Sequence, residues 1–117
     1  MTKARGFYRW FLQRLTGLLL AVFLITHIVV IHFSGNSPID VNAAQARFQN
    51  PFWLIFYILF LTNTIFHALN GLYGIIEDYN PSAALRLFLS VVLWCTGVVA
   101  LIWGILVILF WRNSGII

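Results

Sequence analysis

Three long apolar runs, separated by two polar stretches, set the pattern of this chain. The runs are Leu15–Phe33, Phe52–Ile76 and Leu87–Trp111, and none of them contains Lys, Arg, Asp or Glu. An α-helix needs roughly 20 apolar residues to cross the hydrocarbon core of a bilayer. The strands of a membrane barrel would be shorter and would alternate in polarity, which these runs do not. The pattern therefore predicts an all-α integral membrane protein with three transmembrane helices.

The polar stretches predict where these helices end and how they are connected. We expect the transmembrane helices over about 12–33, 52–76 and 84–111. In the first connection, Gly35–Pro38 has the composition of a turn, and Val41–Phe48 predicts a short helix on the membrane surface. The second connection, Glu77–Pro81, is short and contains helix-ending residues, and Ser82 can cap the next helix. The second and third transmembrane helices should therefore be antiparallel neighbours.

Composition supports a membrane location. Of the 117 residues, 62% are hydrophobic and only 9% are charged, whereas a soluble domain carries about 25% charged residues. The net charge is +4, but the basic residues are too few and too scattered to follow the phosphates of a nucleic acid. We expect one domain, residues 1–117, that contacts membrane lipid and no nucleic acid.

The basic residues predict an orientation. Four of them precede or begin the first apolar run: Lys3, Arg5, Arg9 and Arg14. Arg86 follows the second connection, while the opposite side carries only Arg47 and Arg112. The positive-inside rule then places the N-terminus on the cytoplasmic or matrix side and the C-terminus outside. The basic start resembles a signal peptide, but no clean cleavage site follows, so we expect a retained helix.

The second apolar run carries small and polar residues on one helical face around His67. Asn63 and Thr64 lie one turn before this histidine, and Asn70 and Gly71 lie one turn after it. Polar groups inside a membrane span are costly and tend to be functional. The spacing leaves two interpretations of His67 open: an axial haem ligand, because neutral imidazole binds iron well, or a histidine that hydrogen-bonds a neighbouring helix.

Four further polar residues have two interpretations each. His27 lies deep in the first run and is either a structural hydrogen-bonding residue or a ligand. Arg14 is either an interfacial arginine or a clamp on an anionic group such as a haem propionate. Asp78 and Tyr79 either end the second helix or serve a quinone, as proton relay and hydrogen-bond donor. His32, at the outer end of the first run, is expected to be an interfacial histidine reached by water.

The third apolar run predicts packing rather than chemistry. Ser90, Gly97 and Gly104 recur every seven residues, which is typical of a helix face that packs closely on another helix. Cys95 is the one cysteine, which excludes an intramolecular disulfide and a CxxC metal site. We expect it to be a small buried apolar residue.

Two motifs resemble the membrane anchor subunits of succinate dehydrogenase and fumarate reductase. Arg14-Leu15-Thr16-Gly17 is similar to the R-x-[ST]-G/A of these anchors. His67 and Gly71 match an H-x(3)-G motif, and the D-type anchor has an Asp-Tyr pair at the spacing of Asp78 and Tyr79. Ala84-Leu85-Arg86 after the turn also looks like the D-type anchor.

The resemblance implies a b-type haem shared with a second membrane anchor subunit, and a flavoprotein subunit and an iron–sulfur subunit docked on the cytoplasmic or matrix face. It makes His67 an axial haem ligand within the H-x(3)-G motif that includes Gly71, and Arg14 a propionate or quinone-side contact. Tyr79 becomes a hydrogen-bond donor to the substrate quinone, with Asp78 nearby. The location implied is the bacterial inner membrane or the mitochondrial inner membrane.

The chain departs from the family pattern at two places. Part of the family has Arg where this chain has Tyr73, so a propionate contact from that position is not expected. Some members hold two haems, the second through a first-helix histidine near the outer face, and His27 is placed for that role.

Two alternatives remain beside a succinate dehydrogenase anchor. One is a fumarate reductase anchor, which has the same site and the reverse flux. The other is a non-catalytic three-helix scaffold or assembly protein. The chain has no flavin fingerprint, no cysteine cluster and no nucleophile–base pair, so we expect it to carry electrons without performing succinate chemistry itself.

Overall fold

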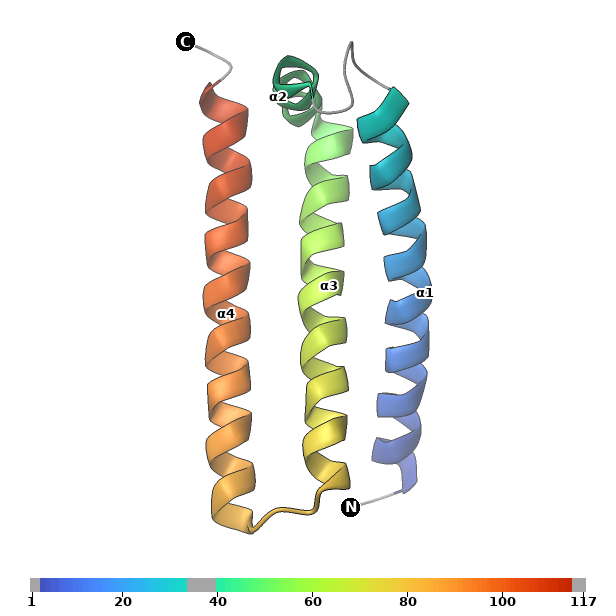
Figure 1. The fold of residues 1–117 in the computed structure, drawn as a ribbon, viewed down its shortest axis with the longest axis vertical. Coiled ribbons are helices and arrows are strands. Elements are labelled where there is room, and N and C mark those ends of the chain that lie inside the picture. Colours follow the sequence, from blue (N-terminus) through green and yellow to red (C-terminus); the bar gives the residue numbers. More distant parts are fainter. Residues whose placement is uncertain (1–2, 34–39, 115–117) are drawn as a thin grey trace.

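The computed structural model describes residues 3–33 and 40–114 and contains four α-helices in this part of the chain (Figure 1). They are α1 (Lys3–Phe33), α2 (Val41–Gln49), α3 (Pro51–Asp78) and α4 (Ala83–Ser114). The three long helices are each long and apolar enough to cross a membrane. The predicted all-α architecture with three spans is therefore confirmed, while its orientation in the membrane stays a prediction. The turn expected at Gly35–Pro38 lies outside the described residues.

The long helices extend beyond the apolar runs that predict them. α1 begins at Lys3 and α4 reaches Ser114, beyond the predicted spans of about 12–33 and 84–111. At 1.5 Å per residue, the 31 residues of α1 span about 46 Å, more than the roughly 30 Å of the hydrocarbon core. Hydropathy marks only the part of a helix that is apolar, whereas good helix formers such as Arg and Gln continue the helix into the interface.

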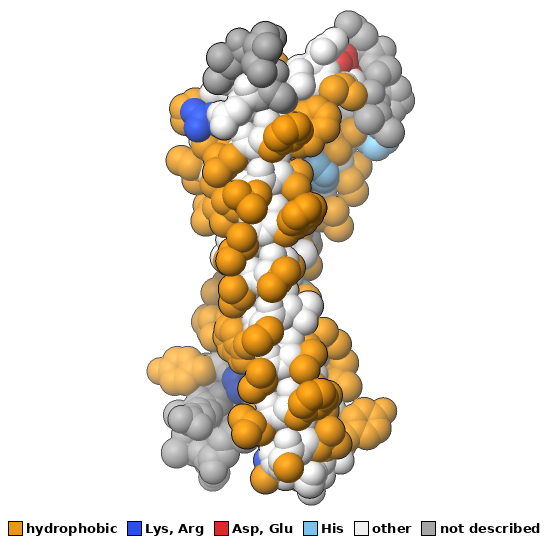
Figure 2. Space-filling view, turned by 90° about the vertical axis from the view of Figure 1, so that its left-hand side faces the viewer, with side chains coloured by type: hydrophobic (Ala, Val, Ile, Leu, Met, Phe, Trp, Pro, Cys, Tyr) orange, Lys and Arg blue, Asp and Glu red, His pale blue; other side chains and the backbone are white. Residues whose placement is uncertain are grey.

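The three long helices stand side by side in one row, with α3 in the middle (Figure 1). α3 packs against both α1 and α4, and α3 and α4 are antiparallel, as the short connection predicts. No hydrophobic side chain in the described part of the chain is buried. The flank formed by α4 is hydrophobic along most of its length, with basic side chains only toward its two ends (Figure 2). Such a row leaves most of its apolar surface to lipid or to partner subunits.

The glycines of α4 bring it close to α3, as the sequence predicts. A Cβ atom on Gly104 would lie 2.5 Å from Leu61 Cδ2, and one on Gly97 would overlap the Leu69 side chain. The helix on which this stripe packs is therefore α3 of the same chain. The expectation that Cys95 is buried is wrong: its side chain is exposed, because it lies on the face of α4 away from these glycines.

The helix ends follow the local sequence. Asp40 caps α2 by accepting a hydrogen bond from Ala43 N at 3.1 Å, which confirms a short helix in the first connection. α2 lies across the end of the row, packs on α3 and α4, and its Gln49 side chain donates to the Arg112 carbonyl (Figure 1). At the other end, Ser82 Oγ accepts from Leu85 N at 3.3 Å, the predicted cap of α4.

Candidate functional site

The imidazole of His67 is held by α1. Its Nδ1 lies 3.0 Å from the Thr16 hydroxyl, and Thr16 has the smallest exposed fraction given for any described polar side chain, 8%. The same hydroxyl donates its proton to the Leu12 carbonyl at 2.6 Å. With its one proton given to the Leu12 carbonyl, Thr16 Oγ1 accepts from His67 Nδ1, and in this arrangement the imidazole proton sits on Nδ1. The Nε2 lone pair then points away from Thr16.

A glycine next to Thr16 leaves room for the imidazole. A Cβ atom on Gly17 would lie 3.2 Å from His67 Cε1, closer than such contacts normally are. The Arg-x-Thr-Gly motif of the first helix and the histidine of the second therefore meet in space. Thr16 sets the tautomer of the ring, and Gly17 provides the space in which it lies.

Further polar contacts run along the same seam between α3 and α1. The Asn63 amide donates to the Thr16 carbonyl at 3.0 Å. The Asn70 amide donates to the Arg9 carbonyl at 3.2 Å and to Gln13 Oε1 at 2.9 Å. The polar stripe predicted on the second span is therefore turned toward the first span of the same chain. Both of these half-buried amides therefore have hydrogen-bond partners, as an apolar environment requires.

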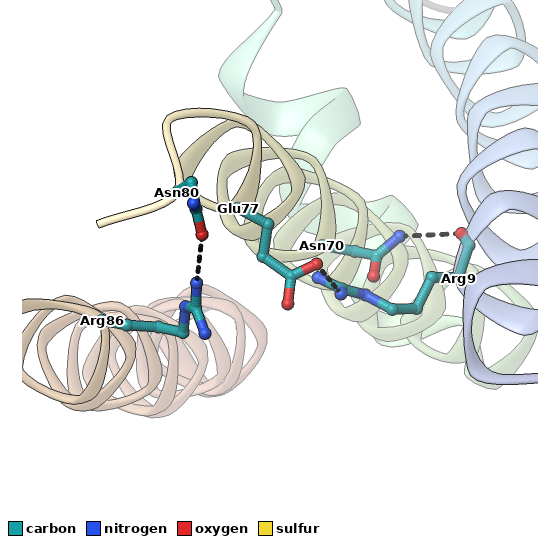
Figure 3. Close-up of polar contacts among 5 residues, drawn as sticks. All are labelled: Arg9, Asn70, Glu77, Asn80 and Arg86. Atoms are coloured by element: carbon teal, nitrogen blue, oxygen red, sulfur yellow. Dashed lines mark hydrogen bonds and ion pairs between the residues drawn. The ribbon is translucent and has the colours of Figure 1, made fainter. Parts of the chain in front are cut away.

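The seam contains two residues that the sequence reasoning did not place at the site: Gln13 and Arg9. A Cβ atom on Gly71 would lie 2.9 Å from Gln13 Nε2, so Gly71 makes room for this side chain. The Arg9 side chain reaches from α1 to α3 and forms an ion pair with Glu77 (Figure 3). The sequence contains a signal for both residues: Arg9, Gln13 and Thr16 recur at helical spacing, so they share one face of the first helix.

The residues present fit an axial haem ligand at His67. The Nδ1–H donates to Thr16, the partner arrangement that orients metal-bound histidines. No hydrogen bond from Nε2 is found within the described part of the chain, so this nitrogen is free to ligate iron. No group of three or more His, Cys, Asp or Glu side chains able to hold a metal ion occurs among the described residues. A single imidazole from this chain suits a haem whose second ligand comes from another subunit.

Three further predicted site residues, Arg14, Asp78 and Tyr79, are exposed. Arg14 is exposed, and its guanidinium carbon lies 5.2 Å from the centre of the Trp10 ring. Asp78 is exposed at the last residue of α3. Tyr79 follows it as the C-cap and is 83% exposed. None of the three contacts His67 directly, and all are accessible to a ligand or a partner subunit.

His27 has different surroundings, toward the α2 end of the row. Its Nδ1 lies 3.1 Å from the Tyr57 hydroxyl, and its ring packs edge-on against Tyr57 and Phe60. Arg47 of α2 lines the same pocket as His27 and Tyr57. Phe60 and Tyr57 precede His67 by seven and ten residues, so the two histidines are separated by about 10–15 Å along the helices. The two imidazoles therefore lie at different levels along the row of helices.

His32 lies at the same end as His27. It is exposed, and its Nδ1 donates to the Ile28 carbonyl one turn earlier at 3.0 Å. This agrees with the expected interfacial histidine.

The sequence matches known proteins over most of its length. Residues 2–101 match the family model described as the succinate dehydrogenase/fumarate reductase transmembrane subunit. Among curated proteins, the succinate dehydrogenase hydrophobic membrane anchor subunit of Coxiella burnetii is 32% identical over 107 residues, which cover 89% of each chain. The subunit of the same name from Rickettsia felis is 31% identical over 114 residues, 95% of this chain and 90% of the relative. That from Thermoplasma acidophilum is 30% identical over 95 residues, 80% of this chain and 77% of the relative.

These matches agree with the motifs and the fold. The bacterial relatives and the three apolar helices identify a multi-pass protein of the inner membrane. The resemblance that rests on the motifs around Arg14, His67 and Asp78 is confirmed. The chain belongs to the succinate dehydrogenase/fumarate reductase transmembrane subunit family.

Proposed function

We propose that this chain is the D-type membrane anchor of a succinate dehydrogenase. In this proposal it binds b-type haem together with a second anchor subunit, and it passes electrons from the iron–sulfur subunit to quinone. The flavoprotein subunit oxidises succinate outside the membrane. Relatives named as succinate dehydrogenase anchors support membership of such a complex.

The observation that carries the haem proposal is the hydrogen bonding of His67. Thr16 Oγ1 uses its proton on the Leu12 carbonyl and accepts from His67 Nδ1. This leaves Nε2 as the nitrogen with a free lone pair, as iron ligation requires. When bound, the haem supplies a one-electron carrier, and the chain's own residues fix the ring, set its tautomer and keep space beside it.

The quinone proposal rests on the exposed residues at the end of α3. Tyr79 and Asp78 lie at the Glu77–Pro81 end of the row, the end that the positive-inside rule places inside. Tyr79 is twelve residues after His67, about 18 Å along the helix axis. A phenol at this point can donate a hydrogen bond to a quinone carbonyl between the haem and the docked iron–sulfur subunit. In the same proposal, Arg14 serves a haem propionate or the quinone side.

A second haem at His27 is a separate proposal. Its support is the separation of about 10–15 Å between the two histidines, which suits two haems stacked across the membrane. In this arrangement the partner anchor supplies the second ligand of each haem. Such a pair would carry electrons toward the outer face, which a single inner haem does not.

The test of the haem proposal is His67→Ala in the intact complex, with the haem-to-protein ratio measured by pyridine haemochrome. We expect the loss of one haem per complex and a weaker assembly of the subunits. His32→Ala is the matched control, because His32 is exposed and its Nδ1 donates to Ile28 of its own helix. An unchanged ratio in His67→Ala rejects the ligand role. A wild-type complex with no reduced b-type haem band favours the scaffold interpretation.

A fumarate reductase anchor is the second candidate, because the matching family model describes both enzymes. Whether such a complex oxidises succinate or reduces fumarate depends on the reduction potential of its quinone and on the other subunits. Rates of succinate oxidation and fumarate reduction by the intact complex, measured with its native quinone, distinguish the two.

A further inference from the structure

One residue of α1, Thr16, is held by two side chains of α3. The Asn63 amide nitrogen lies 3.0 Å from the Thr16 carbonyl oxygen and donates to it. His67 Nδ1 lies 3.0 Å from the Thr16 hydroxyl. Asn63 and His67 are four residues apart and are therefore neighbours on one face of α3. Adjacent residues of the same helix face thus bind both the main chain and the side chain of Thr16.

The position of the Thr16 hydroxyl depends on the position of its main chain. Thr16 is buried, and its hydroxyl is bound within α1, where it donates to the Leu12 carbonyl at 2.6 Å. A threonine side chain in a helix has few rotamers, so a shift of the main chain carries Oγ1 with it. Sliding of α1 along α3 would therefore break the Asn63 contact and lengthen the hydrogen bond at His67 together.

Asn70 makes the same kind of contact further along the seam. Its amide donates at 3.2 Å to the Arg9 carbonyl, seven residues after Asn63 on α3 and seven residues before Thr16 on α1 (Figure 3). It also donates to Gln13 Oε1 at 2.9 Å. Asn70 therefore ties α1 to α3 by at least as many hydrogen bonds as Asn63. The difference is that only Asn63 holds the residue that accepts from His67.

We propose that Asn63 is a positioning residue for the haem ligand His67. By holding the Thr16 carbonyl, it keeps the Thr16 hydroxyl within hydrogen-bond distance of the imidazole Nδ1–H. This inference rests on the proposed role of His67 in haem binding. A hydrogen bond from the second ring nitrogen raises the basicity of a metal-bound imidazole, and such bonds are one means by which a protein sets the reduction potential of a haem. Asn63 thereby acts on the reduction potential through Thr16.

A redox titration of the b-type haem band in the intact complex tests this role. The haem to follow is the one that His67→Ala removes. Asn63→Leu keeps a side chain of similar size but removes the donor to Thr16. The hydrogen bond at His67 is then weaker, the imidazole is less basic and oxidised iron is stabilised less, so we expect the midpoint potential to rise. Asn70→Leu is the matched control, which removes hydrogen bonds from the same seam and should leave the potential unchanged.

A double-mutant cycle with Thr16→Val determines whether Asn63 acts through Thr16. Thr16→Val removes the acceptor itself and should raise the potential of the retained haem more than Asn63→Leu does. In that background Asn63→Leu should cause no further rise, because no hydrogen bond is left to align. A wild-type potential in Asn63→Leu, equal shifts in Asn63→Leu and Asn70→Leu, or additive shifts in the cycle overturn the proposal.

Two further measurements keep the result unambiguous. If Asn63→Leu does not assemble, Asn63→Ser and Asn70→Ser are compared in the same way, since serine keeps a polar side chain but lacks the amide donor. An unchanged haem content in His67→Ala rejects haem ligation by His67, and the role of Asn63 with it. Loss of that haem in His67→Ala, together with unshifted potentials in the Asn63 variants, rejects the role of Asn63 alone.

Discussion

The two histidines that contact a neighbouring long helix, His67 and His27, have similar partners but different surroundings. In both, Nδ1 meets a hydroxyl on the neighbouring long helix. Thr16 donates elsewhere, so it accepts from His67 and leaves Nε2 unprotonated. The Tyr57 hydroxyl can both donate to and accept from His27 Nδ1, so it does not fix one tautomer of His27.

The two histidines therefore differ in what surrounds the ring. At the proposed haem site, Thr16 accepts from His67 Nδ1, and Gly17 leaves space beside the ring. His27 packs against two aromatic rings, and its Nδ1 faces a phenol whose proton it can accept. Haem binding should therefore respond differently to changes around the two residues.

The largest effect is expected from Gly17→Val. The added side chain would meet His67 Cε1, and overpacking of this kind costs about 1–3 kcal/mol. We expect most of the haem held by His67 to be lost, measured as haem per complex. Gly6→Val is the control, because a Cβ atom at Gly6 meets nothing within 4 Å. Equal haem in both variants would show that the space at Gly17 is not needed.

His27→Ala is the next test. If a second haem is bound there, pyridine haemochrome should give two haems per wild-type complex and one in the variant. The remaining haem should keep the spectrum of the His67 site, since about 10–15 Å separates the two histidines. A wild-type content of one haem that this substitution does not change rejects the second haem.

Removing the two hydroxyls separately should give unequal results. Thr16→Val keeps the shape but removes the acceptor of His67 Nδ1–H, and such partners typically change metal affinity by about 10–100-fold. Tyr57→Phe should leave the His67 haem unchanged. Haem retention during detergent titration measures both variants. Similar losses in the two would mean that a general weakening of the α1–α3 contact, and not the tautomer, controls binding.

Tyr79→Phe should have the smallest effect on haem, because Tyr79 is 83% exposed and lies about 18 Å from His67. We expect unchanged haem content and quinone reduction slowed by about tenfold, the loss of one hydrogen bond. Succinate oxidation with an artificial dye acceptor should stay intact. Loss of both activities together would indicate an assembly defect and not a quinone contact.

The sequence by itself determined the three spans, the antiparallel pair α3 and α4, and the close packing of α4. These follow from local patterns: apolar length, a short connection ending in Ser82, and glycines every seven residues. It also determined that His67 is unusual, because a polar stripe inside a span is costly wherever it faces. The family motifs can be recognised from the identity and spacing of residues along the chain alone.

Only the tertiary structure decided which residues meet. The contacts of Thr16 with His67 and of Arg9 with Glu77 join residues 51 and 68 positions apart, and a helical pattern gives the face of a residue but not the neighbour of that face. The direction of the hydrogen bond at His67 depends on a third residue, Leu12, whose carbonyl accepts the Thr16 proton. Cys95 was misassigned for the same reason, since in a single row of helices an apolar residue faces lipid or a partner as readily as another helix.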